Sequence, residues 1–162
     1  MAREYCRLLT SIWGTQEFVA RSAGAQRLYF LLLSQPELSM CGVLTPAPSR
    51  WASFAPDTTD RGVKAALAEL QEHGYIFHDR ITEELWIRSF VRHDSKLGTP
   101  NVAVGVTKAF CAVRSPSIRL GILQEIRKTF PKGLSDAFTN DIRKRFAQEF
   151  REAERKALAD NS

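Results

Sequence analysis

Residues 58–88 show the clearest pattern of hydrophobic and polar positions in the chain. In the first half, apolar residues recur at helical spacing and form one stripe, made of Val63, Ala66, Leu67 and Leu70. Thr58 or Thr59 is suited to cap the start of this helix, and Gly74 to end it as a left-handed residue. The second half predicts a half-buried hairpin with its tip at residues 79–84 and with four inward residues: Tyr75, Phe77, Leu85 and Ile87.

The segment before this pattern predicts a buried helix behind a short lead-in. Residues 25–34 are strongly apolar, and we expect the central helix of the domain to run from Ser22 to about Gln35, where a proline follows. In the lead-in, Trp13 is expected in the core and Thr15 is expected to cap a short helical turn.

Two short elements complete the pattern. Residues 42–44 predict a strand, and residues 48–54 predict a helix with Trp51 and Phe54 facing inward. Helix, short strand, helix, turn, helix and hairpin is the order of elements in a winged helix-turn-helix, where a third strand joins the wing. We therefore expect a mainly α fold with a small β-hairpin, a winged helix-turn-helix, at residues 1–94. The alternative is an ordinary helix packed on a hairpin.

A helical C-terminal region is expected at residues 102–162, after a polar linker at residues 95–101. Residues 102–113 are rich in β-branched residues, which favour a strand, although their apolar positions also fit one helical face. We expect a helix there, capped by Asn101, and a further helix capped by Ser115.

The last predicted helix, at residues 136–159, has an apolar stripe made of Phe138, Ile142, Phe146 and Phe150. This stripe needs a partner, either the body of this chain or a second copy. A homodimer would suit a palindromic DNA site, which dimeric helix-turn-helix proteins commonly bind. Basic and acidic residues alternate along the same helix, which is typical either of a nucleic-acid contact or of a solvated face.

The chain resembles a family of DNA-binding proteins in four successive segments. These read AQRLYFLLL, RWASFA, VKAALAELQEHGYIFHD and LWIRSFVRHDSKLGTPNVAVGVTKAFCAVRSPSIR. Their order resembles the N-terminal winged-helix domains of phage replication initiators, or replisome organisers, and small helix-turn-helix proteins of actinobacterial phages. The resemblance covers about residues 5–127.

The resemblance implies contacts to double-stranded DNA, because the third helix of a winged helix usually enters the major groove while the wing touches the backbone. Arg61 would donate to guanine and Lys64 to a base or phosphate. The full implied set is Ser49, Arg50, Thr58, Thr59, Arg61, Lys64, Ala65, Ala68, Arg80, Arg88 and Arg92. The alternative for each charged member is a solvated surface charge. Asp60, Glu83 and Glu84 argue against a uniformly DNA-facing surface, and the two glutamates are expected to be exposed at the hairpin tip.

The charge of the chain is unevenly placed. The 162 residues have a net charge of +5. Residues 1–100 contain 11 Lys/Arg and 11 Asp/Glu, whereas residues 101–162 contain 12 and 7. Any DNA-binding face in the first part therefore has to be local.

Other function classes find little support. The three cysteines and three histidines follow no ligand spacing, so we expect no metal and no cofactor. No phosphate loop, nucleophile elbow or other catalytic motif is present, and we expect no enzyme. No apolar run reaches 18 residues and no signal peptide opens the chain, so we expect a cytoplasmic protein without a membrane partner.

The sequence thus predicts a sequence-specific DNA-binding protein of phage or mobile-element origin that regulates transcription or starts replication. The rival hypothesis is a protein-interaction module, in which the terminal helix binds a replication or host protein.

Overall fold

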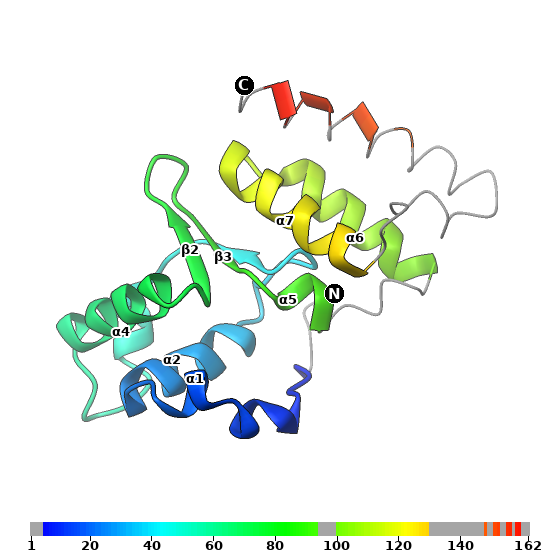
Figure 1. The fold of residues 1–162 in the computed structure, drawn as a ribbon. Helices are drawn as coiled ribbons and strands as arrows, with labels where there is room; N and C mark the ends of the chain where they lie inside the picture. Colours follow the sequence, from blue (N-terminus) through cyan, green and yellow to red (C-terminus); the bar gives the residue numbers. More distant parts are fainter. Residues whose placement is uncertain are drawn as a thin grey trace.

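The computed structural model describes residues 5–93 and 100–129, together with residues 148, 151, 152, 155, 156, 158 and 159. This part of the chain is mainly helical with a small three-stranded antiparallel sheet (Figure 1), which confirms the expected mainly α fold with a small hairpin. Its elements are a 3-10 turn η1 (Thr10–Gly14), α1 (Gln16–Val19), α2 (Ala23–Leu33), β1 (Val43–Leu44), α3 (Pro48–Ala52), α4 (Asp60–Glu72), β2 (Ile76–Asp79), β3 (Glu84–Ile87), α5 (Phe90–His93), α6 (Pro100–Ala112) and α7 (Pro116–Thr129).

Helices α2 and α4 are joined at the start of α2. The Ser22 hydroxyl caps α2 by accepting from the backbone N–H of Ala25, and the helix begins close to the predicted start at Ser22. The same hydroxyl and its backbone N–H donate to the Glu69 carboxylate of α4 at 2.6 and 2.8 Å. These hydrogen bonds from Ser22 lower the pKa of Glu69. The contact fixes the crossing of the two helices that form the core below the sheet.

Helix α4 begins and ends where the sequence predicts. Thr59 caps it by accepting from the Gly62 N–H at 3.1 Å, and Val63, Ala66 and Leu70 are buried. Gly74 adopts a φ of +74°, which favours glycine and turns the chain into the sheet.

The sheet has the order β1-β3-β2, so β3 is its central strand. Its two faces contribute to two separate cores. Ile76, Leu85 and Ile87 pack with α2 and α4, whereas Val43 and Trp86 pack with α6 and α7. The sheet is therefore covered by helices on both sides (Figure 1).

The alternation of residues along the hairpin had predicted one buried and one exposed face. Because helices cover both faces of the sheet, this prediction is wrong for β3. All four residues of β3 are buried. On β2 the prediction was wrong for Phe77, which is 37% exposed, while its neighbour Ile76 is buried. Asp79 and Glu84 belong to the strands, so the tip consists of residues 80–83.

Residues 102–113 form a helix, as expected, and belong almost entirely to α6. Val106, Phe110 and Val113 are buried on its one apolar face. Because α6 begins at Pro100, Asn101 lies inside the helix and does not precede it as a cap. Ser115 does cap α7, accepting from the Ile118 N–H at 3.2 Å.

Three predictions on aromatic and capping residues are wrong. Phe54 is 51% exposed because α3 ends at Ala52, and only Trp51 faces inward. Trp13 is 52% exposed, although its ring packs on those of Phe18 and Phe30. Thr15 does not cap α1, since its hydroxyl donates backward to the Ile12 carbonyl.

The proposed association stripe Phe138, Ile142, Phe146 and Phe150 lies outside the described residues. The described members of the same segment are helical and exposed, and Gln148 donates to Glu152 at 3.1 Å. Within the part of the chain that the structure describes, no helix is long and apolar enough to cross a membrane.

Candidate nucleic-acid interface

The outer face of α4 is open and, apart from Glu72 at its end, is lined by small or basic side chains. Arg61, Lys64, Ala65 and Ala68 are all exposed, opposite the buried stripe of the helix. A 13-residue helix is about 20 Å long. The absence of bulky side chains at residues 65 and 68 lets its backbone approach another surface closely.

Two of the predicted DNA contacts, Ser49 of α3 and Lys64 of α4, interact with Asp60 at the start of α4. Asp60 accepts from the Ser49 hydroxyl at 2.8 Å and pairs with Lys64 at 2.6 Å. The hydrogen bond from Lys64, followed by that from Ser49, lowers the pKa of Asp60. This network ties α3 to α4 and neutralises the acidic residue that the sequence placed among the DNA contacts.

Two further predicted contacts are engaged elsewhere. Arg50 pairs with Glu37 and donates to the Gln35 side chain at 3.1 Å, so it fastens α3 to the loop after α2. Arg92 pairs with Glu125 of α7 at 3.4 Å. Both residues are exposed, but their guanidinium groups already have carboxylate partners.

Arg61, Arg80 and Arg88 differ from these, because they form no ion pair within the described residues. Arg61 lies on the outer face of α4 and Arg80 at the hairpin tip, and all three are exposed. Thr58 is half-buried, and the hydroxyl of Thr59 is occupied as the helix cap. Of the predicted DNA contacts, the arginines that remain for an external anion are therefore on α4 and on the hairpin.

The hairpin tip is clamped by the turn between α6 and α7, which the sequence pattern did not indicate. Glu84 was predicted to be exposed, but it is buried with 7% exposure. Its carboxylate accepts from the backbone N–H groups of Arg114 and Ser115, the latter at 2.7 Å. Glu83 is exposed, as expected, with a φ of +56°. The burial of Glu84 arises because residues 30 positions later supply its donors.

Asp79, which pairs with Glu84 across the two strands, strengthens the same clamp. Its carboxylate accepts from the N–H groups of Ile81 and Thr82 at 2.9 and 3.3 Å. A hydrogen bond from the Ser115 side chain is the main reason that the pKa of Asp79 is lowered. The tip is thus held in one shape by two carboxylates.

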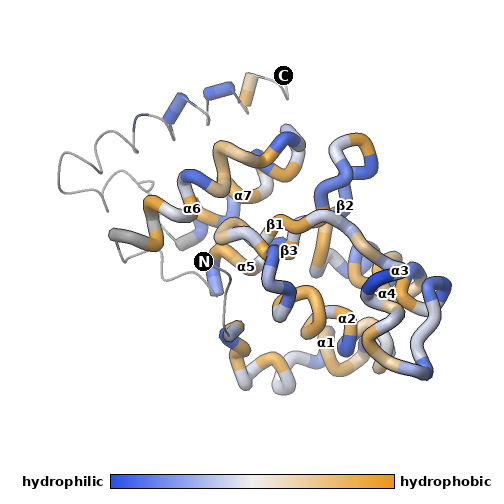
Figure 2. The backbone as a smooth tube through the Cα atoms, turned by 180° about the vertical axis from the view of Figure 1, so that it is seen from behind, coloured by the Kyte–Doolittle hydropathy of each residue, from blue (hydrophilic) through white to orange (hydrophobic). Residues whose placement is uncertain are grey.

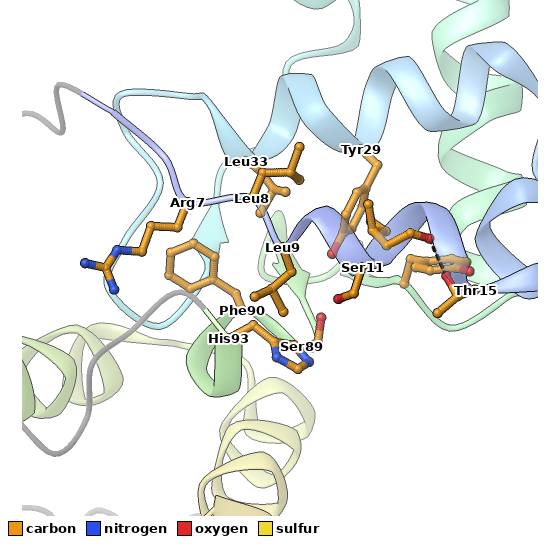
Figure 3. A pocket seen from close by; sticks show the side chains of 12 residues that line it. Arg7, Leu8, Leu9, Ser11, Thr15, Tyr29, Leu33, Ser89, Phe90 and His93 are labelled. Atoms are coloured by element: carbon orange, nitrogen blue, oxygen red, sulfur yellow. Dashed lines mark hydrogen bonds between the residues drawn. The ribbon is translucent and has the colours of Figure 1, made fainter.

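Two hollows lie near these elements. One, of about 220 Å³, lies between the hairpin and α7 and is lined by Phe77, Trp86, Arg88, Ser117, Leu120, Gly121 and Gln124. The other, of about 250 Å³, lies between the lead-in, α2 and α5 (Figure 3). Its lining is mostly apolar, and the guanidinium group of Arg7 points away from it. Burial, followed by the charge of Arg92, lowers the pKa of His93 at its edge.

The described residues contain no group of three or more His, Cys, Asp and Glu side chains placed to hold a metal ion. No protein-family model, no curated protein and no solved structure matches the chain.

Proposed function

We propose that this chain is a sequence-specific, double-stranded DNA-binding protein built as a winged helix-turn-helix, and that it regulates transcription or starts replication in a phage or mobile element. The order α2, β1, α3, α4, β2 and β3 supports the fold, with α4 as the recognition helix and the β2–β3 hairpin as the wing. Strand β1 lies beside the hairpin in one sheet, as this fold requires.

The observation that supports the function best is the outer face of α4. It combines Arg61, which forms no ion pair with the residues that the structure describes, with the small residues Ala65 and Ala68 one turn and two turns further along the helix. A helix with this face fits the major groove, where an arginine donates two hydrogen bonds to guanine. Two of the nearby acidic residues are compensated, because Asp60 is paired with Lys64 and Glu69 is bonded to Ser22. Glu72, at the end of the same face, is exposed and opposes an approaching phosphate.

Selection from a random duplex pool tests this function. We expect a defined sequence to be enriched and bound with an affinity that falls as salt rises, because phosphate contacts release counterions. Failure of the intact protein to bind duplex DNA at low salt would contradict the proposal, and it would favour a protein-interaction module on the same scaffold.

Two substitutions then distinguish the recognition of bases from contacts to the phosphate backbone. Arg61→Ala should cost roughly 1–3 kcal/mol on the selected site and relax the preference at one position. Arg80→Ala should weaken binding to the selected and to the scrambled duplex by the same factor. If both variants lose the same affinity on every DNA sequence, α4 does not recognise bases.

A further inference from the structure

The described part of the chain has an unequal charge distribution. Residues 5–93 contain nine Lys/Arg and nine Asp/Glu, so the candidate recognition helix and hairpin lie in an electrically balanced body. Residues 100–129 contain five Lys/Arg and only Glu125 as an acid. Glu125 is buried and pairs with Arg92 and Lys128, so the α6–α7 pair presents an almost purely basic surface.

This basic pair adjoins the hairpin on the side away from α4. The α6–α7 turn lies next to the hairpin tip, and both views of the fold show the order α4, hairpin, α7 (Figures 1 and 2). A direct hydrogen bond joins the two, from the Arg114 guanidinium to the Thr82 carbonyl at 2.5 Å. The start of α7 therefore lies beside the hairpin tip, with the hairpin between it and α4.

Two arginines at this turn are oriented by the protein itself. Arg114 donates to Thr82 and forms an ion pair with the Glu84 carboxylate at 3.7 Å, but its side chain stays 66% exposed, against 39% for Arg92 in its own pair. Arg119 donates through Nε to the Val113 carbonyl at 2.6 Å. A guanidinium has five N–H donors, so each keeps donors for an external anion after these bonds. A side chain oriented in advance loses less conformational freedom when it binds a phosphate.

The acidic groups at the same place are largely compensated. The Glu84 carboxylate accepts from the Arg114 and Ser115 N–H groups, and Asp79 accepts from Ile81 and Thr82. Glu83 is the exposed acid of the tip, and it opposes an approaching phosphate.

We propose that the α6–α7 turn, through Arg114 and Arg119, forms with Arg80 of the hairpin tip a second contact surface for the DNA phosphate backbone, beside the groove that α4 reads. This inference rests on the proposed DNA-binding function and extends its footprint to a part of the chain outside the winged helix. Glu84 and Asp79 act as positioning residues that hold the turn against the tip.

The salt dependence of binding to the selected duplex tests this inference. Each lost phosphate contact should lower the slope of log K against log salt by about 0.9, so Arg114→Ala with Arg119→Ala should lower it by about 1.8. The ratio of affinities for selected and scrambled duplexes should stay unchanged. Glu83→Gln should bind more tightly than the wild type at low salt.

Arg127→Ala is the control, because it removes one positive charge from the far end of α7, and its effect is compared with half of the effect of the double variant, which removes two. It should change the slope much less than the double variant, and thermal unfolding should show that both variants remain folded. If the wild type binds its site and the double variant has the wild-type or the control slope, this inference is wrong while the proposed function stands. If the wild type binds no duplex, both this inference and the proposed DNA-binding function are wrong.

Discussion

The Glu84 carboxylate accepts a hydrogen bond from the backbone N–H of Ser115 at 2.7 Å, and this bond joins the central strand of the sheet to the first turn of α7. A negative charge at the beginning of a helix is stabilised by the helix dipole and by the N–H groups that have no partner within the helix. Glu84 therefore serves both as a strand residue and as a partner for the start of α7.

Glu84→Ala should lower the free energy of unfolding by about 3 kcal/mol, because it leaves the N–H groups of Arg114 and Ser115 without their acceptor. Chemical denaturation measures this. Glu83→Gln, at the exposed neighbouring position, should change it by less than about 0.5 kcal/mol. Similar losses for both variants would mean that the clamp does not stabilise the fold.

The packing of α7 on the sheet depends on the lack of a side chain at Gly121. A Cβ added there would lie 2.6 Å from Cη2 of the buried Trp86 and would overlap the same ring elsewhere. Gly121→Ala should destabilise the protein by roughly 1–3 kcal/mol, because the buried indole has to shift to admit the added Cβ. Thermal and chemical unfolding measure the loss.

Gly105→Ala provides the comparison for that prediction. An added Cβ at this position of α6 meets the side chain of Met40, which is flexible and partly exposed and can move. The gain in helix propensity is about 1 kcal/mol at both glycines. Gly105→Ala should therefore be neutral or slightly stabilising, and a larger loss at residue 105 than at residue 121 would contradict this account of the packing.

Acid should loosen the clamp at the hairpin tip. The pKa of Asp79 is lowered in the folded state, mainly by the Ser115 hydrogen bond, so its contribution to stability is present at neutral pH. That contribution is lost as the pH falls below the ordinary value of about 3.9 and through the lower folded value. The difference in unfolding free energy between wild type and Asp79→Asn should thus be larger at pH 7 than at low pH.

Asp57→Asn is the control for this pH dependence, because Asp57 lies exposed in the loop between α3 and α4. A difference for Asp79→Asn that stays constant from neutral to acidic pH would show that the carboxylate is not preferentially stabilised as the anion.

The sequence alone determined the helices and most of their boundaries. Five helices, α2, α3, α4, α6 and α7, were predicted close to where they occur, because apolar residues at helical spacing and side-chain caps such as Thr59 and Ser115 act within a few residues. The exposed face of α4 follows from the same periodicity. These features depend on neighbours in the chain, so their signals are local.

Only the tertiary structure decided which faces of the sheet are covered. The alternation along β3 indicated one buried face, but α6 and α7, which come later in the chain, cover the other and bury Glu84 and Trp86. The same holds for the ion pairs that engage Arg50 and Arg92. Whether a charged side chain is free or paired depends on residues that folding brings close from distant positions, and the spacing of residues in the sequence does not encode those distances.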